Sequence, residues 1–284
     1  MDVILDILLQ GIAVGSTFLL GALGLTIIYG VMGVVNLAHG EFIMLGAYVV
    51  ALLAGSIPLG LAMLAAVLIL GAIGYLVDFS LIRFLYHKPV ASMLGTWGLG
   101  MVLRQGTILL FGPELRYVAV PVAGTFSVAF GVTYSVWRAC LVAASVATAI
   151  AVWLIITRSA FGLKMRAVIG NPDVAESLGL RVERVNRWAF ALGIALAGTA
   201  GALISPLRTV FPGMGLPFLV GAFLVVILAG LGNVRATVVW SMLIGLGTAA
   251  VSIPVNDITA QISIWAAALI IIAFRRDSLT VARV

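Results

Sequence analysis

Long apolar runs follow one another along the chain, and short segments between them hold most of the charged residues. A membrane-spanning helix needs about 20 mostly apolar residues. By this criterion the pattern predicts nine helical segments, at residues 4–29, 36–55, 58–82, 89–111, 134–157, 188–205, 218–232, 236–253 and 258–274. The second and seventh are short or interrupted by glycine, so each is expected to be either a complete span or a broken, re-entrant helix.

The composition is typical of a protein embedded in a membrane. Of 284 residues, 63% are hydrophobic and 9% are charged, and the mean hydropathy is +1.25, whereas a soluble domain carries about 25% charged residues. We therefore predict an all-α polytopic membrane protein with about eight or nine transmembrane or re-entrant helices, forming one transmembrane domain over residues 1–284. No basic region precedes the first segment, which is expected to be a retained span and not a cleaved signal peptide.

Basic residues mark one side of the predicted membrane protein. They gather between the third and fourth segments, in the loop 158–187 and in the C-terminal tail. The first and last groups consist of Arg83, Lys88, Arg275, Arg276 and Arg283. Because cytoplasmic loops carry the excess of Lys and Arg, nine crossings with the N-terminus outside place all three groups and the C-terminus in the cytoplasm. The net charge of +6 therefore indicates topology and not nucleic-acid binding, and His87 is expected at the membrane interface.

The stretch 30–48, GVMGVVNLAHGEFIMLGAY, is unusual because it places Asn36, His39 and Glu41 between two apolar runs. Asn36 is predicted to cap the second helix. Residues two apart on a helix diverge by about 200°, so we expect one of His39 and Glu41 to face a pathway and the other to contact a neighbouring helix. Two interpretations stay open, a structural clasp between helices and a translocation pathway, and they do not exclude each other.

Arg104 and Gln105 lie within the fourth apolar segment. A charge at that depth must face protein, water or a counter-ion, and Glu41 and Glu114 are the candidate partners. Asp78 and Arg138 stand near segment ends and are predicted to reach the membrane interface.

A second polar turn, with Asn233 and Arg235, separates the seventh and eighth segments. Its order of apolar run, glycines, asparagine and charge resembles the stretch 30–48. This similarity suggests an internal repeat with both turns near one pathway, and chance similarity between glycine-rich segments is the alternative.

The loop 158–187 is long for a connector between packed helices, and its centre reads NPDVAESLGL. Asn171 as an N-cap, Pro172 at the first helical position, Asp173 at the positive helix end and Gly179 as the stop predict a short helix at residues 172–178. Val174, Ala175 and Leu178 give this helix an apolar face. The face is expected to dock on a partner protein, and lying on lipid headgroups is the alternative.

Several chemistries lack their sequence motifs in this chain. No GxxxxGK[ST] phosphate loop, HExxH motif or paired-cysteine metal site occurs, and the single cysteine, Cys140, excludes an intrachain disulfide. No Ser-His-Asp or Cys-His set can be assembled either. The sequence therefore favours neither an enzyme nor a metal site, and no cofactor is expected on this chain.

Three stretches resemble one family of transport proteins: GLTIIYGVMGVVNLAHGEFIMLGAY, GNPDVAESLGLRVERVNRWAFALGIALAGTAGAL and AFLVVILAGLGNVRATVVWSMLIGLG. They are similar to the LivH-like permeases of branched-chain amino-acid ABC importers, a family that includes urea and short-chain amide branches. The resemblance covers nearly the whole chain in the expected order and includes the Asn36, His39, Gly40 and Glu41 motif. It implies a bacterial or archaeal cytoplasmic-membrane permease that works with a homologous second permease, two ATPase subunits and an extracytoplasmic substrate-binding protein.

The resemblance also implies roles for residues of the polar stretches. The short helix in loop 158–187 looks like the coupling helix that docks on the ATPase, with Asn171, Pro172, Asp173, Val174, Glu176, Ser177, Leu178 and Gly179. Candidates for the translocation pathway are Asn36, His39, Glu41, Trp97, Arg104 and Asn233.

The solute and the energy source have more than one interpretation. The stretch 95–105, GTWGLGMVLRQ, resembles the urea and amide branch more than the amino-acid branch. We therefore expect inward transport, by alternating access, of urea, a short-chain amide or a branched-chain amino acid. The alternative is a stand-alone channel or a proton-coupled carrier that uses His39 and Glu41, and a third possibility is a structural membrane scaffold.

Overall fold

The computed structural model describes residues 2–86, 88–128, 131–230 and 232–274, and most of this part of the chain is helical. The elements are α1 (Asp2–Met32), α2 (His39–Leu53), α3 (Leu59–Ser80), the 3-10 turn η1 (Ile82–Leu85), α4 (Pro89–Phe111), β1 (Thr125–Ser127), β2 (Thr133–Ser135), α5 (Val136–Arg158), α6 (Ala160–Gly170), α7 (Pro172–Ser177), α8 (Val182–Ile204), α9 (Gly215–Ala229), α10 (Val234–Ser252) and α11 (Asp257–Phe274). The strands form an antiparallel hairpin in which Phe126 lies opposite Tyr134. His87 and the tail arginines (Arg275, Arg276 and Arg283) lie outside the described residues.

The nine predicted segments correspond to α1–α5 and α8–α11, which confirms an all-α, multi-pass membrane fold. Within the described ranges, five helices are long and apolar enough to cross a membrane, namely α1, α3, α5, α8 and α10. Helices α2 and α9 have 15 residues each and rise about 22 Å, less than the ~30 Å hydrocarbon core. These two are the second and seventh segments, so their predicted shortness is confirmed, while nine crossings stay a prediction.

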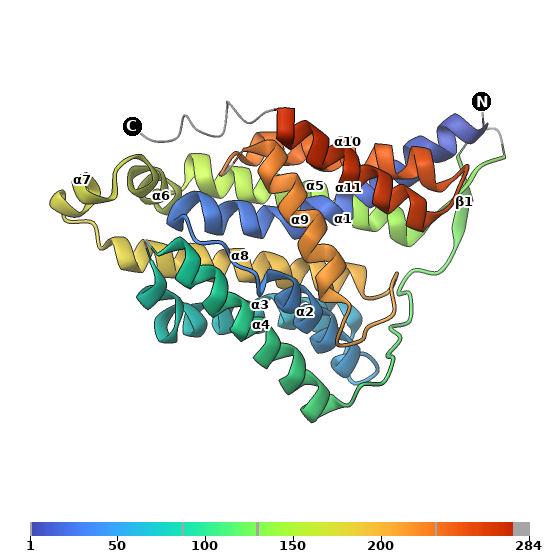
Figure 1. Cartoon of the computed structure of the whole chain (residues 1–284). Helices are drawn as coiled ribbons and strands as arrows, with labels where there is room; N and C mark the ends of the chain where they lie inside the picture. The colour runs from blue at the N-terminus through green and yellow to red at the C-terminus, as the bar shows by residue number, and fades with distance from the viewer. Residues whose placement is uncertain (1, 87, 129–130, 231, 275–284) are drawn as a thin grey trace.

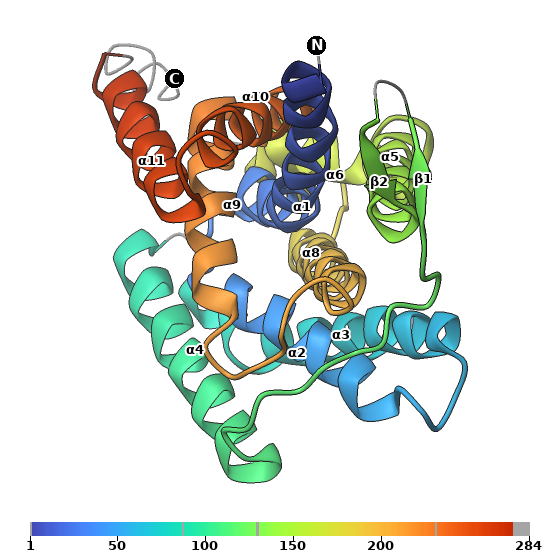
Figure 2. The same ribbon diagram turned by 90° about the vertical axis from the view of Figure 1, so that its right-hand side faces the viewer.

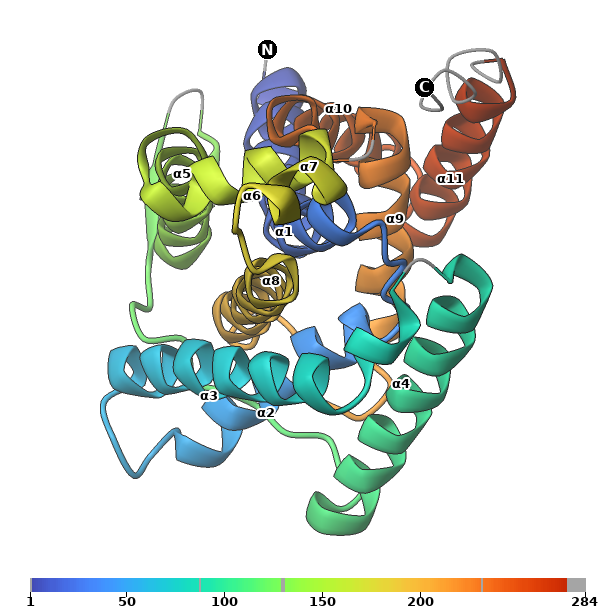
Figure 3. The ribbon, with the colours of Figure 1, turned by 90° about the vertical axis from the view of Figure 1, so that its left-hand side faces the viewer.

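The long helices lie alongside one another, with the start of α1 at one end of the bundle and α7 at the other (Figure 1). Viewed along the bundle, α1 and α8 are central, whereas α4 and α11 stand at one outer edge (Figure 2). Two-thirds of the most apolar window of α8 is buried, against a third or less for the other long helices. Helices α6 and α7 cover the end opposite the β-hairpin (Figure 3), and the basic loop 158–187 lies there too.

The helices pack in a pattern that relates the first part of the chain to the last. Helix α1 packs most extensively on α10 and α3 on α8, while α2 also packs on α8 and α9 on α1. The first residues of α2 and α9 meet, because a Cβ on Gly40 would lie 2.9 Å from the carbonyl carbon of Gly215. This pattern equates α1–α3 with α8–α10. It differs from the predicted repeat, which aligned the stretch 30–48 with the turn before α10.

Glycine permits the closest of these helix contacts. A Cβ on Gly46 of α2 would lie 2.6 Å from the carbonyl oxygen of Gly198 on α8, and a Cβ on Gly30 would lie 2.7 Å from the Cα of Gly232. Small residues let membrane helices approach closely where lipid provides no hydrophobic driving force. The contact between Gly30 and Gly232 holds the end of α1 against the turn that leads into α10.

The loop 158–187 contains more helix than the sequence predicted. Helix α6 precedes α7, and α8 begins at Val182 and not near residue 188. The hydroxyl oxygen of Ser159 accepts a hydrogen bond from the Gly162 N–H at 2.9 Å and caps α6. Met165 and Val168 of α6 are buried, so packing against the bundle stabilises a helix that ends in glycine.

Candidate functional site

Helix α2 starts inside the bundle, after an irregular segment that reverses the chain direction. Gly33 has a φ of +63° and ends α1. The side-chain oxygen of Asn36 accepts a hydrogen bond from the Ala38 N–H at 3.1 Å, and the carbonyl of Asn36 accepts one from the His39 N–H at 3.2 Å. The N-cap residue is Ala38, without a side-chain cap. The predicted N-cap role of Asn36 is therefore wrong by two residues: Asn36 forms the turn that precedes the helix.

His39 fixes the start of α2 to the middle of α1. Its side chain is fully buried, and its Nε2 lies 2.8 Å from the carbonyl oxygen of Gly21. Because a carbonyl can only accept, Nε2 carries the hydrogen. Its Nδ1 has no hydrogen-bond partner among the described residues. Gly24 is required beside it, since a Cβ there would lie 2.9 Å from the imidazole Cε1.

Glu41 binds Arg104 and so connects α2 with α4. The Nε of Arg104 donates to Oε1 of Glu41 at 3.1 Å, and Nη2 donates to the same oxygen. Of the two predicted counter-ions, Glu41 is therefore the partner and Glu114 is not. A second connection lies nearby, where the Leu37 N–H donates to Oγ1 of Thr96 on α4 at 3.0 Å.

The two members of this ion pair differ in exposure. The Glu41 side chain is 5% exposed, whereas that of Arg104 is 38% exposed. The Oε2 of Glu41 has no hydrogen-bond partner among the described residues. One carboxylate oxygen and one edge of a guanidinium are therefore free of protein partners.

The structure supports the prediction that His39 and Glu41 face different neighbours, since one contacts α1 and the other α4. Both side chains join helices, which agrees with the clasp interpretation. The side chain of this group that reaches the surface of the chain is Arg104. A pathway role for these residues stays a prediction.

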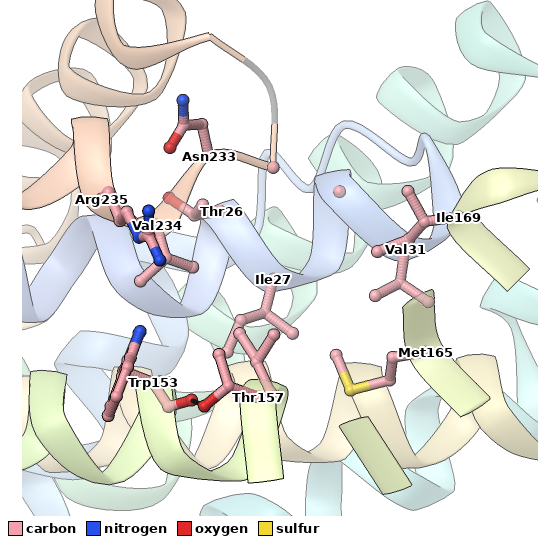
Figure 4. A pocket seen from close by; sticks show the side chains of 13 residues that line it. Thr26, Ile27, Val31, Trp153, Thr157, Met165, Ile169, Asn233, Val234 and Arg235 are labelled. Atoms are coloured by element: carbon pink, nitrogen blue, oxygen red, sulfur yellow. Dashed lines mark hydrogen bonds between the residues drawn. The ribbon is translucent and has the colours of Figure 1, made fainter. Parts of the chain in front are cut away.

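The remaining pathway candidates do not share one location. Trp97 is 49% exposed on α4, seven residues before Arg104 and thus on the same helix face. Asn233 instead accepts a hydrogen bond from the Ala236 N–H at 3.1 Å and caps α10. It lines a separate cavity of about 410 Å³ at the α6 end of the bundle (Figure 4).

This cavity lies between α1, α5, α6 and the start of α10. Its lining comprises Thr26, Ile27, Gly30, Val31, Trp153, Ile156, Thr157, Met165, Ile169, Gly232, Asn233, Val234 and Arg235. The sequence analysis missed this site, because its residues come from four distant segments. It contains none of the polar residues at the start of α2.

Helix α7 has the caps that the sequence predicted. The side-chain oxygen of Asn171 accepts from the Asp173 and Val174 N–H groups at 3.0 and 3.1 Å. Pro172 is the first helical residue, and Gly179 has a φ of +85°. The predicted short helix is confirmed, although it ends at Ser177, one residue early.

The apolar residues of α7 divide between two directions. Ala175 is buried against the bundle, whereas Val174 and Leu178 are 53% and 78% exposed. Asp173, Glu176 and Ser177 are exposed as well. Helix α7 therefore presents two large apolar side chains and polar neighbours. It lies at the end of the bundle that faces the viewer in Figure 3.

Asp78 is a second charged centre, and its predicted place at the membrane interface is wrong. The Asp78 side chain is fully buried in the last turn of α3. The Tyr86 hydroxyl donates to its Oδ1 at 2.6 Å, and Nε of Arg187 on α8 lies 3.5 Å from its Oδ2. Burial, followed by the neighbouring Asp78 carboxylate, raises the pKa of Tyr86 and keeps its hydroxyl a donor. Arg138, in contrast, is exposed at the start of α5, and its location at the membrane interface stays a prediction.

Aromatic rings pack against Arg187, the ion-pair partner of Asp78. The guanidinium of Arg187 lies 5.4 Å from the ring centre of Tyr75 and 4.9 Å from that of Phe79. Arg83 lies 4.4 Å from the same Phe79 ring. Cations near ring faces are stabilised by the ring quadrupole, so the junction of α3, η1 and α8 is a rigid charged cluster.

Comparison with known proteins identifies the family. The family model described as "Branched-chain amino acid transport system / permease component" matches residues 7–274. The chain belongs to this family. The match covers nearly all of the helices described above, and both charged centres lie within the matched residues.

Individual relatives agree with this assignment. The permease is 28% identical to the high-affinity branched-chain amino acid transport system permease protein BraD of Pseudomonas aeruginosa, over 85% of this chain and 84% of BraD. It is also 28% identical to LivH of Escherichia coli K12, over 84% and 83% of the two chains. LivM of the same organism is 26% identical, over 80% of this chain and 59% of LivM. No solved structure matches the permease. It is a multi-pass protein of the cytoplasmic membrane.

Proposed function

We propose that this permease is the transmembrane subunit of an ABC importer and moves a branched-chain amino acid inward by alternating access. The observation that carries the proposal is the family match over residues 7–274, and the relatives BraD and LivH are named for branched-chain amino acid transport. ATP binding and hydrolysis would then take place on partner subunits. Urea and short-chain amides, suggested by the stretch 95–105, are the second candidate solutes.

The ion pair between Glu41 and Arg104 supports an amino-acid solute. An amino acid carries a carboxylate and an ammonium group. This pair offers one partly exposed cation and, beside it, a buried carboxylate oxygen without a hydrogen-bond partner among the described residues. Urea has no charge and requires neither group. Arg104 is therefore proposed to contact the solute carboxylate, while Glu41 is proposed to contact the ammonium group.

The surface of α4 supports a pathway on this side of the molecule. Helix α4 contacts the bundle mainly at α2 and η1, and its outer face exposes Val90, Leu94, Trp97, Met101 and Leu109. A charge at membrane depth must face protein or water, so the half-exposed Arg104 argues against a face turned wholly to lipid. We expect the second permease to approach along α4, with the pathway between the two chains. Asn36 and His39 would support this surface by fixing the start of α2.

Helix α7 is proposed to dock on the ATPase. Its exposed Val174 and Leu178, with Asn171, Pro172, Asp173, Glu176, Ser177 and Gly179 around them, make a short apolar surface at the cytoplasmic end. The loop that follows leads directly into α8, the most buried long helix. Movement of α7 would therefore be passed to the centre of the permease.

The partners follow from the same proposal. LivM-like chains are candidates for the second permease, because this permease is similar to LivM as well as to LivH. Two ATPase subunits and an extracytoplasmic binding protein complete the importer. The residues proposed for transport lie within one permease domain.

Uptake by proteoliposomes tests the proposal. The complete transporter, reconstituted with ATP inside and the binding protein outside, should accumulate leucine, isoleucine or valine and not urea. The permease alone should carry no solute, whereas a channel or proton-coupled carrier would. Uptake by the permease alone would overturn the proposal that it works as part of an ABC importer. ATP-dependent uptake of urea without amino-acid uptake would overturn the proposed solute.

A variant of α7 tests the coupling role separately. Leu178→Glu places a charge on the proposed docking surface and leaves the N-cap Asn171 and the positive-φ Gly179 unchanged. We expect ATPase activity to lose its stimulation by the loaded binding protein, with unchanged thermal stability of the permease. Leu163→Glu on α6 is the matched control, because Leu163 is also an exposed leucine, at 62% against 78% for Leu178. Normal stimulation in Leu178→Glu would assign the docking site elsewhere.

A further inference from the structure

A groove on the side of α5 and α10 is separate from the proposed pathway. A hollow of about 280 Å³ lies between these two helices and shares the lining residues Trp153, Val234 and Arg235 with the 410 Å³ cavity. Its other lining residues are Leu19, Val146, Ala149, Ile150, Val238 and Met242. This 280 Å³ hollow is the groove, and its lining extends from Arg235 and Trp153 to Val146 and Met242.

The helix packing leaves this groove open. Helices α5 and α10 each pack extensively on α1 but not on each other. Figure 2 shows α5 and α10 on different sides of α1. The floor of the groove is therefore α1, which contributes Leu19, and its walls are apolar side chains of α5 and α10.

A single cation stands at the mouth of the groove. Arg235 is exposed in the first turn of α10, and it makes no hydrogen bond or ion pair within the described parts of the chain. None of the residues that line either hollow is acidic. In Figure 4 the Arg235 and Trp153 side chains lie at the same end of the cavity.

The position of Arg235 along α10 sets its depth in the membrane. Val234–Ser252 is long and apolar enough to span a bilayer, so Arg235 stands at the edge of the hydrocarbon core. From Trp153 the groove runs along α5 to Val146, about 10 Å, which fits within one leaflet of ~15 Å. An apolar channel of that depth, with a cation at the headgroup level, matches the two parts of a phospholipid.

We propose that this groove binds an anionic phospholipid of the cytoplasmic leaflet. Its phosphate contacts Arg235, and one acyl chain lies between α5 and α10 over Leu19. Basic pockets between membrane helices on the cytoplasmic side suit anionic headgroups. The bound lipid fills the space between α5 and α10 that the protein leaves open.

Native mass spectrometry of the complete transporter tests this site. After removal of bulk lipid, we add phosphatidylglycerol or phosphatidylcholine and measure the lipid retained by the permease. The unmodified permease should retain phosphatidylglycerol in preference. Arg235→Gln should weaken that binding about five-fold, while Arg208→Gln, which removes an exposed arginine from a different loop, should leave it unchanged.

A second variant tests the acyl-chain part of the groove. Ala149→Trp fills the groove without altering Arg235 and should also reduce phosphatidylglycerol retention. Equal retention by the unmodified permease and both variants would overturn the proposal, as would equal retention of phosphatidylcholine. Cross-linking of the Ile150→Cys variant to another subunit would overturn it too, because a protein would then occupy the groove.

Discussion

Within the part of the chain that the structure describes, two pairs of an arginine and a carboxylate join helices, and they differ in how completely they are enclosed. Asp78 is fully buried, accepts a hydrogen bond from the Tyr86 hydroxyl and forms an ion pair with Arg187. The Arg187 side chain is 15% exposed, and its guanidinium lies over aromatic rings. In the other pair, one oxygen of Glu41 accepts both hydrogen bonds from Arg104, whose side chain is 38% exposed.

The difference suggests two roles. A pair in which both side chains are enclosed fixes helices, because removing one member leaves an uncompensated charge. A half-open pair has capacity for a further partner. We therefore infer that Asp78 and Arg187 hold α8 against α3, and that Glu41 and Arg104 serve the pathway.

Arg187→Gln should have the largest effect on stability. It leaves the buried carboxylate of Asp78 with Tyr86 as its one strong donor. Breaking a buried pair costs about 3–5 kcal/mol, and because Arg187 is partly exposed we expect the lower end, about 3 kcal/mol. Thermal unfolding of the purified transporter measures the loss.

Arg83→Gln is the control for this prediction. Arg83 contacts the same Phe79 ring as Arg187 but has no ion pair among the described residues. It should cost less than about 1 kcal/mol. If the two variants were equally stable, the ion pair between Asp78 and Arg187 would not stabilise the contact between α3 and α8.

Arg104→Gln should reduce transport strongly. It should also cost some stability, because it leaves the 5% exposed Glu41 carboxylate without its charged partner. The proposed contact with the solute carboxylate is lost, and we expect uptake to fall at least ten-fold, equivalent to about 1.4 kcal/mol. Uptake of a branched-chain amino acid by proteoliposomes measures it, with thermal unfolding in parallel. Arg104→Lys keeps the charge and should restore part of the uptake.

The assignment of different roles to the two pairs would be wrong if Arg104→Gln destabilised the permease as much as Arg187→Gln does. The pair with Glu41 would then be a clasp, as one interpretation of the sequence held. Normal uptake and normal stability together would leave the pair without a role in transport.

The sequence predicted those features that depend on local pattern. Apolar length predicted nine helical segments, and the glycines marked α2 and α9 as the short ones. The capping residues Asn171, Pro172 and Gly179 predicted α7, because each acts on its own backbone or its immediate neighbours. Arg104 required a counter-ion at membrane depth, and Glu41 was one of two acidic residues considered.

The features that the sequence did not predict depend on contacts between distant segments. Asp78 near the end of an apolar run looks like an interfacial residue until α8 packs on α3 and brings Arg187 beside it. Helix α6 lacks strong local signals, with a glycine at its end and basic residues within, and packing of Met165 and Val168 stabilises it. Asn36 shows a finer limit: its side chain forms a turn before the helix, and the helix begins two residues later than the pattern indicated.

Tyr86→Phe should cost less stability than Arg187→Gln, and it tests whether the Asp78 and Glu41 pairs act independently. It removes one donor from Asp78 and keeps the ring, so a hydrogen bond to a charged group is lost, worth about 1.5 kcal/mol. The raised pKa of Tyr86 keeps the hydroxyl protonated in the folded protein, so the loss should not vary between pH 6 and pH 9. Combined with Arg187→Gln, Tyr86→Phe should show a non-additive loss in unfolding measurements, because both act on one carboxylate. Combined with Arg104→Gln it should be additive, since that pair lies elsewhere in the molecule; coupling there instead would mean that the two charged centres act as one.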